Sequence, residues 1–343
     1  MRRILFVISI TLSLVIFGSQ AVLCRNSDDT FIEVFFNDPT LTTHDRTLQD
    51  MILHQINRAQ ESIDIAIYNF TDTYTRDALI KAAKNGIEIR IVIDEDNRDA
   101  SVLKELEKAG VKVVIAQSNG LMHSKYIIID NDITISGSAN LTVGSFFYDN
   151  NFLILIQSEE VNQIFKAEFN EMFEERLFGD RSPKTTPPDM ITLDDGTRLL
   201  VRFSPDDSVE DILVSLINAS SKSIQVLAYS FSSNDLGNAL IRQYEAGLDV
   251  SVIFEKEKAY RDSGGEAEFL ERAGVPIYMD GSDGLMHEKV FIFDKSIVAA
   301  GSYNFTRSAD ERNDEQILII DSPIITEQFL REYELLLIDA SQP

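Results

Sequence analysis

Two stretches of the 343-residue chain decide its fold: residues 120–140, GLMHSKYIIIDNDITISGSAN, and residues 284–304, GLMHEKVFIFDKSIVAAGSYN. Both contain the pattern His-x-Lys-x4-Asp-x6-Gly-Ser-x-Asn with the same internal spacing. The pattern occupies His123, Lys125, Asp130, Gly137, Ser138 and Asn140 in the first stretch, and His287, Lys289, Asp294, Gly301, Ser302 and Asn304 in the second. Packing alone does not readily produce such a pattern twice, so we expect it to serve a shared chemical role.

The repeat extends on both sides of this motif. Residues 49–157 resemble residues 210–321, and the offset is 161 positions early in the repeat and 164 later. An insertion of three residues near Gly264-Gly265, a loop-type sequence, accounts for the change of offset. Such a duplication predicts two similar halves in a pseudo-two-fold arrangement, like a homodimer fused into one chain.

Each half alternates predicted strands with predicted helices. In the first half we predict strands at 31–36, 62–68, 87–93, 111–115, 126–129, 133–136 and 152–156, and helices at 45–59, 75–83, 100–109 and 161–177. Strands separated by crossover helices indicate an α/β fold with layered sheets. The prolines between residues 183 and 188 predict an exposed connector. We therefore expect an N-terminal segment 1–24, a first half 30–178, a linker 179–194 and a second half 195–340.

The motif combines groups that suit phosphate-ester chemistry. A His and a Lys two positions apart on a strand face the same side, so an imidazole and an ammonium lie next to each other. A neutral imidazole can attack phosphorus to form a phosphohistidine, and a second imidazole can protonate the leaving alkoxide. The scheme predicts His123 and His287 as catalytic, with Lys125 and Lys289 stabilising the developing charge. It needs no metal or other cofactor, and the sequence contains no convincing cluster of metal ligands.

The other motif residues are predicted to support this site. Four polar side chains are expected to bind substrate oxygens: Ser138, Asn140, Ser302 and Asn304. Gly137 and Gly301 permit close backbone approach or a positive φ angle. Asp130 and Asp294 end hydrophobic strands, which favours turn-capping or ion-pairing over direct catalysis. The remaining histidines, His44 and His54, have no counterpart in the repeat and are expected to be structural or superficial.

The N-terminus has the features of an export signal. Arg2 and Arg3 precede the apolar residues 4–17, and residues 19–21, Ser-Gln-Ala, offer a cleavage site. An uncleaved membrane anchor is the alternative, because the apolar region is nearly long enough to span a bilayer. Lipidation of Cys24, the single cysteine, is a third outcome. We expect an exported protein that is secreted, periplasmic or anchored through its N-terminus.

The composition limits the partners of the chain. Its formal net charge is −25, which disfavours a general nucleic-acid coat protein and tight attachment to anionic lipid. A small basic cleft remains compatible with this charge, because net charge says little about local potential. Since both motifs occur in one chain, we expect a monomer.

The paired motifs resemble the two HKD motifs of the phospholipase D superfamily, and the resemblance covers roughly residues 45–340. It implies two α/β/α sandwich halves, a pseudo-two-fold and one active site at the interface of the halves. It also implies a metal-independent mechanism through a phosphohistidine. Within the superfamily, residues 286–309 are similar to bacterial endonuclease-type members and to mitochondrial cardiolipin hydrolases.

The resemblance also implies that the two histidines differ. Members of the superfamily often have a downstream Asn-x-Glu whose carboxylate orients the catalytic histidine. The second half has it as residues 313–315, Asn-Asp-Glu, whereas the first half has residues 149–151, Asp-Asn-Asn. Glu315 is therefore expected to support His287, with an amide or Asp149 beside His123. In two-motif relatives the N-terminal histidine is commonly the nucleophile, which favours His123, whereas Glu315 favours His287.

Four functions are compatible with these features. The leading hypothesis is an exported phospholipase D-type phosphodiesterase that hydrolyses phospholipid head groups at a membrane surface. A secreted nuclease is the first alternative, with nucleic acid as partner and with Arg307 and Arg312 as candidate cleft residues. A phosphatidyl transferase resembling cardiolipin synthases is the second. A non-catalytic phosphate-binding scaffold is the third, although neither motif lacks a residue.

Overall fold

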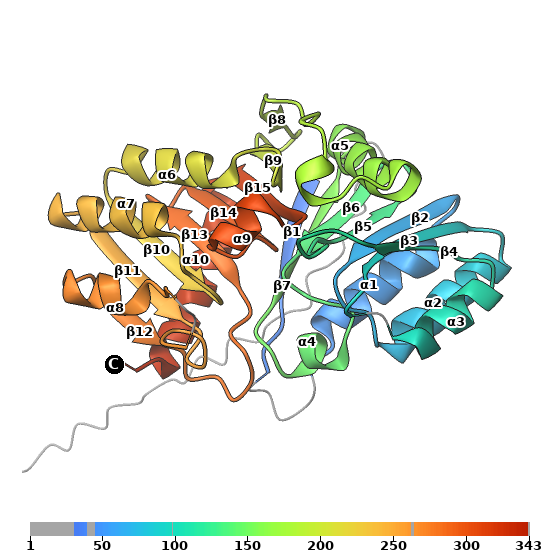
Figure 1. Cartoon of the computed structure of the whole chain (residues 1–343), viewed down its shortest axis with the longest axis horizontal. Coiled ribbons are helices and arrows are strands. Elements are labelled where there is room, and N and C mark those ends of the chain that lie inside the picture. The colour runs from blue at the N-terminus through green and yellow to red at the C-terminus, as the bar shows by residue number, and fades with distance from the viewer. Residues whose placement is uncertain (1–30, 40–44, 98, 262–263, 342–343) are drawn as a thin grey trace, which may run out of the picture.

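A computed structural model describes residues 31–39, 45–97, 99–261 and 264–341 (Figure 1). The predicted export signal, Cys24 and His44 lie outside the described residues. The chain forms two halves, each built on one twisted mixed sheet, and the two sheets face each other across the centre of the molecule. The α/β class and the duplicated architecture predicted from the sequence are confirmed.

The first half contains a seven-stranded sheet in the order β1-β7-β6-β5-β2-β3-β4. Its strands are β1 (Phe31–Phe36), β2 (Ser62–Ile67), β3 (Glu88–Asp94), β4 (Lys112–Ala116), β5 (Lys125–Ile129), β6 (Ile133–Gly137) and β7 (Phe152–Gln157). Strands β2, β3 and β4 are parallel, and the pairs from β2 through β5, β6 and β7 to β1 are antiparallel. The motif histidine and lysine therefore stand at the start of β5, beside the carboxyl end of β2.

The second half repeats this order with one strand added. Its strands are β8 (Ile191–Thr192), β9 (Arg198–Ser204), β10 (Ser223–Ala228), β11 (Asp249–Phe254), β12 (Ile277–Met279), β13 (Lys289–Phe293), β14 (Ile297–Gly301) and β15 (Glu315–Asp321). They lie in the order β12-β11-β10-β13-β14-β15-β9-β8, so β9 and β15 correspond to β1 and β7. The additional β8 falls inside the segment predicted as a linker and pairs with β9.

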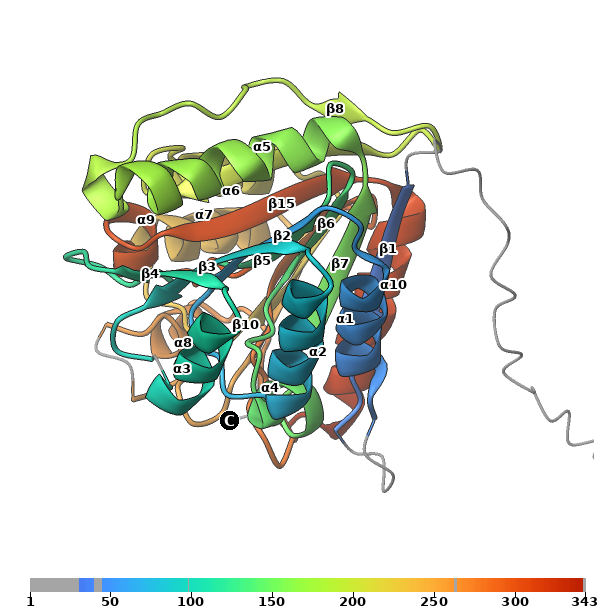
Figure 2. The same cartoon turned by 90° about the vertical axis from the view of Figure 1, so that its right-hand side faces the viewer.

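Helices cover both faces of each sheet. The helices are α1 (Thr47–Arg58), α2 (Thr73–Lys84), α3 (Ala100–Lys108), α4 (Val143–Phe147), α5 (Glu159–Asn170), α6 (Val209–Ala219), α7 (Asn234–Glu245), α8 (Ala267–Arg272), α9 (Arg307–Glu311) and α10 (Pro323–Asp339). Helices α1–α3 cover the outer face of the first sheet (Figure 2), and α6–α8 cover the outer face of the second. Helices α5 and α10 contribute to the core between the sheets.

The predicted helix 161–177 is shorter than expected. Helix α5 ends at Asn170, and a π-helical turn over Glu171–Glu175 continues it. Arg176 then takes a left-handed conformation, with φ 59°, which stops the helix. The 3₁₀ turn Gly179–Arg181 opens the connector to the second half.

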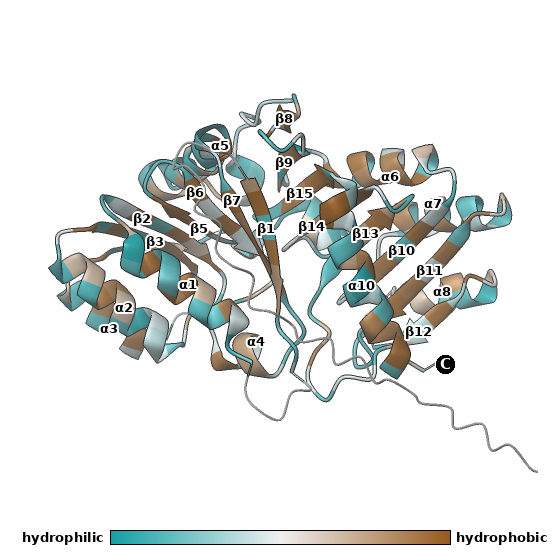
Figure 3. Cartoon of the chain, turned by 180° about the vertical axis from the view of Figure 1, so that it is seen from behind, coloured by the Kyte–Doolittle hydropathy of each residue, from teal (hydrophilic) through white to brown (hydrophobic). Residues whose placement is uncertain are grey.

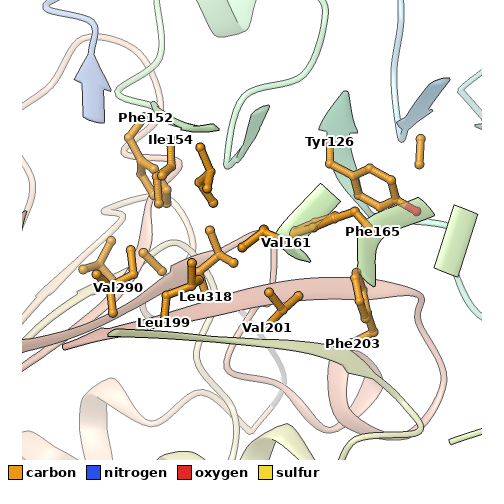
Figure 4. Packing of buried hydrophobic residues seen from close by; sticks show 14 of the residues in the cluster. Tyr126, Phe152, Ile154, Val161, Phe165, Leu199, Val201, Phe203, Val290 and Leu318 are labelled. Carbon is orange, nitrogen blue, oxygen red and sulfur yellow. The ribbon is translucent and has the colours of Figure 1, made fainter. Parts of the chain in front are cut away.

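Three hydrophobic clusters hold the fold together. Two of them lie between a sheet and its outer helices, and the third joins the two halves. In this central core Phe165 of α5 packs edge-on against Phe203 of β9, with ring centroids 5.3 Å apart, and against Tyr126 at 5.0 Å (Figure 4). The strands are almost continuously apolar, and the polar residues lie mainly on the outward faces of the helices (Figure 3). Burial on both faces explains the unbroken apolar runs of these strands.

Candidate active site

The two motifs meet where the halves face each other, because each motif crosses into the opposite half. The His123 N–H donates to the Asp314 carbonyl at 2.9 Å, and the Asp314 N–H donates to the Leu121 carbonyl at 2.9 Å. The second half makes the same exchange, in which the His287 N–H donates to the Asn150 carbonyl at 3.0 Å. Each histidine is therefore fixed by backbone hydrogen bonds to the half from which it does not come.

Two glycines allow this crossing. A Cβ atom at Gly120 would overlap the Arg312 carbonyl, and one at Gly284 would overlap the Tyr148 carbonyl. Only a residue without a side chain permits the two backbones to approach so closely. The equivalence of Gly120 and Gly284, together with the matching hydrogen bonds, confirms that the interface has a pseudo-two-fold arrangement.

The crossing reverses the predicted partners of the histidines. Nδ1 of His123 lies 2.6 Å from Oε2 of Glu315, and Nδ1 of His287 lies 3.0 Å from Oδ1 of Asn151. The expectation that Glu315 supports His287, with an amide or Asp149 beside His123, is therefore wrong. Residues 313–315 pair with the segment before His123, so they face that histidine. Asp149 instead accepts the Leu285 N–H at 3.1 Å.

These contacts fix the tautomer of each imidazole. A carboxylate oxygen and an amide oxygen both accept hydrogen bonds, so Nδ1 carries the proton in both rings. In the neutral ring Nε2 then carries the lone pair. The two histidines thus have the same orientation and tautomer, but only His123 has an acidic partner.

The motif serines position the partners of the histidines. The Ser302 hydroxyl donates to Oε2 of Glu315 at 2.8 Å, and the Ser138 hydroxyl donates to Oδ1 of Asn151 at 2.9 Å. Their hydroxyl oxygens also accept backbone N–H groups of β15 and β7. Because these hydroxyls are engaged within the protein, the contacts support a positioning role rather than the substrate-binding role predicted for the two serines.

The motif asparagines and glycines have different roles. Oδ1 of Asn140 and Oδ1 of Asn304 are buried, and neither has a hydrogen-bond partner among the described residues. These amides therefore remain candidates for binding substrate. Gly137 and Gly301 are needed for close approach, since a Cβ atom at either would overlap a carbonyl of the neighbouring strand.

The two aspartates cap loops, as predicted. Asp130 accepts the N–H groups of residues 60, 61 and 62, and Asp294 accepts those of residues 221, 222 and 223. Both aspartates have a φ near +50° and lie at the far ends of β5 and β13 from the motif lysines. They anchor the loops that lead into β2 and β10.

The motif lysines lie against two tyrosines. Nζ of Lys125 donates to the His123 carbonyl at 2.6 Å, and its ammonium lies 5.2 Å from the centre of the Tyr68 ring. In the second half, Nζ of Lys289 donates to the His287 carbonyl at 2.5 Å and lies 4.4 Å from the Tyr229 ring. Each tyrosine also packs edge-on against its histidine. Cation–π contacts of this kind stabilise a buried ammonium.

Burial controls the protonation of the site. The side chains of both histidines, both lysines and Glu315 are almost completely buried. Burial lowers the pKa of each histidine well below its usual value, and the two ammonium groups lower it further. Burial also lowers the pKa of Lys125 to about 7 and raises that of Glu315 to about 7. Burial likewise lowers the pKa of Lys289 well below its usual value. The resulting site holds neutral imidazoles beside two lysines and one carboxyl group, and an anionic ligand would favour the charged form of the lysines.

Three residues at the site lie outside the predicted set. Tyr68 and Tyr229 occupy matching positions in the repeated segments SIDIAIYNF and SIQVLAYSF, so the repeat alone could have identified them as candidate site residues. Gln316 had no such signal. Its side chain accepts the Lys125 N–H at 3.0 Å and donates to the Lys125 and Gly137 carbonyls, so that β15 is tied to β5 and β6 of the other half.

The remaining candidates have structural or surface positions. Met122 and Met286, which directly precede the motif histidines, are fully buried in the central core. His54 is exposed on α1. Arg307 is largely exposed and pairs with Glu311 on α9, which indicates a solvated ion pair. Arg312 lines a cavity beside the site and donates to the Ser308 hydroxyl at 2.5 Å.

Two features are absent from the described residues. Within them, no group of three or more His, Cys, Asp or Glu side chains could hold a metal ion. No helix in this part of the chain combines the length and apolar character needed to cross a bilayer. The expectation of metal-free chemistry remains a prediction.

The fold and the crossed motifs define a class: a duplicated α/β/α chain whose two His-x-Lys motifs form one composite site. The chain belongs to the phospholipase D-like family, because the family model described as "Cardiolipin synthase, PLD-like domain" matches residues 52–173 and 213–337. The superfamily resemblance deduced from the motifs is thereby confirmed.

The relatives differ in how much of the chain their alignments cover. Phospholipase D of Rickettsia conorii is 30% identical over 131 residues, which cover 38% of this chain and 65% of the relative. Cardiolipin synthase 1 of Bacillus anthracis is 24% identical over 333 residues, which cover 86% of this chain and 65% of the relative. The chain thus spans slightly less than two thirds of these relatives. The crystal structure of phosphatidylserine synthase from Haemophilus influenzae Rd KW20 has a TM-score of 0.70 and 12% identity, covering 92% of this chain and 89% of that one, and supports the fold alone.

Proposed function

We propose that the chain is an exported phospholipase D-type enzyme that hydrolyses the head-group phosphodiester of phospholipids through a phosphohistidine. The observation that carries the proposal is the crossed pair of buried histidines, one backed by Glu315 and the other by Asn151. A neutral imidazole with a fixed tautomer is a competent nucleophile. Two buried ammonium groups beside it attract a phosphodiester monoanion.

The first step uses the carboxylate-backed histidine. Nε2 of His123 attacks phosphorus, and the ring becomes a phospho-imidazolium whose Nδ1–H is held by Glu315. The bond from phosphorus to the leaving oxygen breaks, and that oxygen takes a proton from His287. The bound phosphate favours this protonated form of His287, since a nearby anion raises the pKa of an imidazole.

The second step returns the enzyme to its starting state. His287 removes a proton from water, and the resulting oxygen attacks the phosphorus of the phosphohistidine. The phosphorus–nitrogen bond breaks, and His123 recovers its lone pair. The products are a phosphomonoester and a free alcohol. If an alcohol enters in place of water, the same step transfers the phosphatidyl group, so the acceptor alone separates hydrolysis from transfer.

Several observations support a lipid substrate. The Rickettsia conorii relative is named a phospholipase D, and a relative from Xenopus tropicalis is named a mitochondrial cardiolipin hydrolase. A nuclease is less well supported, because the cavity beside His123 is lined by Asp94, Glu95 and Asp96, which would repel the adjacent phosphates of a strand. The N-terminal export signal predicted from the sequence would bring the enzyme to a membrane surface.

Phosphatidyl transfer is the second candidate. Its specific support is the cardiolipin synthase relative, which matches 86% of this chain, whereas the phospholipase D relative matches 38%. Transfer would require that an alcohol outcompete water for the phosphohistidine. Such competition depends on how the acceptor binds beside His287.

A parallel assay of the purified mature protein tests both candidates. We expect phosphatidate from phosphatidylglycerol or phosphatidylcholine vesicles, at an unchanged rate in EDTA, and no cleavage of single-stranded DNA. Adding glycerol to the phosphatidylcholine vesicles reports transfer, because it would divert product from phosphatidate to phosphatidylglycerol. Release of nucleotides without lipid cleavage would overturn the lipid assignment, and loss of activity in EDTA would contradict the metal-free scheme.

A further inference from the structure

One buried side chain of the second half reaches into the motif of the first half. Gln316, on β15, accepts the Lys125 N–H at 3.0 Å, and it donates to the Lys125 carbonyl at 3.0 Å and to the Gly137 carbonyl at 3.1 Å. The oxygen and the nitrogen of its amide are therefore both engaged, and the side chain is fully buried. A buried polar group whose partners are all satisfied holds those partners in one arrangement.

These contacts fall where the ladder between two strands stops. Lys125 is the first residue of β5, and Gly137 is the last residue of β6. The pairing of the two strands ends at Tyr126 and Ser136, one step before Lys125 and Gly137. The Gln316 amide occupies this place and satisfies backbone groups at the end of the ladder. It therefore fixes the backbone from which the Lys125 side chain extends.

The Lys125 ammonium depends on the position of its own backbone. Its Nζ turns back to donate to the His123 carbonyl at 2.6 Å, and it lies 5.2 Å from the centre of the Tyr68 ring. A shift of the end of β5 would move this ammonium and the backbone of the adjoining histidine together. Misplacement of a catalytic group by about 1 Å can cost on the order of 100-fold in rate.

The equivalent position in the first half has no such amide. At the repeat offset of 164 positions Gln316 corresponds to Phe152. The Phe152 ring lies in the central core (Figure 4) and packs against Phe36 and Phe329, with centroids 6.4 Å and 5.2 Å apart. A phenyl ring cannot hold the backbone of Lys289 as an amide holds that of its counterpart. Because the fold accommodates an apolar side chain at this position, the amide at 316 points to a role beyond folding.

We propose that Gln316 is a positioning residue that holds Lys125 against the scissile phosphate, so that the two motif lysines are unequal. Two adjacent residues of the second half then serve the first-half motif, Glu315 for His123 and Gln316 for Lys125. Lys289 has a phenylalanine in the corresponding place. The effect on the chemical step rests on the proposed function, whereas the hold on Lys125 rests only on the contacts.

Orthophosphate binding tests this role without catalysis. Titration calorimetry on the full chain should show that Gln316→Met weakens orthophosphate binding about tenfold, because the unbranched Met removes all three hydrogen bonds and releases Lys125. Adding Gln316→Met to Lys125→Ala should change binding by less than about twofold, since the ammonium through which Gln316 acts is already absent. In the Lys289→Ala background the loss of about tenfold should remain.

Phe152→Leu is the matched control, because it alters a buried side chain at the equivalent position without removing a side-chain hydrogen bond. It should lower stability and leave orthophosphate binding within about twofold. Circular dichroism and thermal unfolding check the fold of each variant. If Gln316→Met does not fold, Gln316→Asn replaces it. That variant keeps an uncharged amide but is one methylene shorter, and it should give a smaller loss with the same dependence on Lys125.

Kinetics then connect the hold on Lys125 to the reaction. With bis(4-nitrophenyl) phosphate we expect Gln316→Met to lower kcat/KM about 100-fold in the wild type and less than about twofold in the Lys125→Ala background. Equal losses of phosphate affinity in all three backgrounds, or no loss in any, would overturn the positioning role.

The two measurements also separate this inference from the proposed function. If the wild-type chain cleaves no phosphodiester, the proposed function fails, but the calorimetric cycle still decides whether Gln316 acts through Lys125. The expected binding pattern with an unchanged kcat/KM would overturn the link between Gln316 and catalysis.

Discussion

Each motif histidine shares one oxygen acceptor with a motif serine, and we call each such set of three side chains a histidine relay. The two relays have the same geometry but differ in the acceptor. In the first relay Ser302 and His123 both contact Oε2 of Glu315, and in the second Ser138 and His287 both contact Oδ1 of Asn151. An amide fixes the orientation and tautomer of a ring. A carboxylate does this too and also stabilises the cation that forms on the ring. A single acidic group is therefore enough to make two repeated histidines unequal.

This inequality removes a conflict in the sequence-based expectations. The position of His123 in the N-terminal motif favoured it as nucleophile, whereas the supposed pairing of Glu315 with His287 favoured the other histidine. Because Glu315 contacts His123 across the interface, both arguments now support His123. His287, with a neutral partner, is better suited to pass a proton to the leaving group and to recover it from water.

The largest expected effect separates the two histidines. His123→Asn and His287→Asn should each lower phospholipid hydrolysis by at least about 10³-fold, because each removes a group used in both steps. With bis(4-nitrophenyl) phosphate, whose leaving group needs no proton, His287→Asn should still form the phosphoenzyme, and His123→Asn should not. Mass spectrometry of the quenched protein measures the adduct. A phosphoenzyme in His123→Asn that is absent from His287→Asn would reverse the assignment.

Exchanging the two acceptors tests whether the carboxylate creates the inequality. Glu315→Gln keeps a hydrogen-bond acceptor but removes the charge, and should lower kcat about 100-fold. Asn151→Asp adds a charge beside His287 and should have a smaller effect on kcat, since the nucleophile is unchanged. Both variants need matching circular dichroism and thermal unfolding to the wild type. Equal losses in the two variants would show that geometry, rather than charge, is what the relays require.

The pH dependence should report the same carboxylate and its neighbouring lysine. Glu315 must be ionised and Lys125 must be protonated in the free enzyme, and each has a pKa of about 7 because of burial. As pH falls below about 7, Glu315 gains a proton and kcat/KM falls; as pH rises above about 7, Lys125 loses a proton and kcat/KM falls. Lys125→Arg should weaken the alkaline decline, because a guanidinium stays charged, and Lys289, whose pKa burial also lowers, should account for the remainder. A flat profile between about pH 6 and pH 9 would exclude these groups.

The sequence was sufficient for the architecture but not for the crossed contacts. The repeat, the apolar strands β5 and β13, and the loop-capping roles of Asp130 and Asp294 all follow from local patterns, and the structure confirms them. The partner of each histidine does not follow from such patterns. His123 and Glu315 lie 192 positions apart, and aligning Glu315 with Asn151 reveals only which positions are equivalent. Which half supplies each acceptor depends on backbone pairing between halves, and local periodicity carries no information about that pairing.

The smallest expected effect on activity concerns Asp314 and Asn150. These residues directly precede Glu315 and Asn151 and are likewise equivalent in the repeat. Burial raises the pKa of Asp314 to about 8, far above the usual value of an aspartate near 4. The folded state therefore holds this proton more tightly than the unfolded state, so its contribution to stability is lost as pH rises from about 4 to about 8. An amide at this position has no proton to lose, and the equivalent Asn150 shows that the site accommodates one, with Oδ1 accepting the Ser282 hydroxyl at 2.6 Å.

Asp314→Asn should accordingly stabilise the protein more at pH 8.5 than at pH 5, by on the order of a few kcal/mol, since one pKa unit corresponds to about 1.4 kcal/mol. The amide oxygen can still accept the Gly179 N–H, which Asp314 accepts at 2.7 Å, so the connector between the halves keeps its anchor. Urea unfolding at the two pH values measures the difference. Asp189→Asn, at an exposed position of the same connector, controls for the change in net charge. Destabilisation of Asp314→Asn at both pH values would mean that the carboxylate, rather than a neutral acceptor, is needed where the halves join.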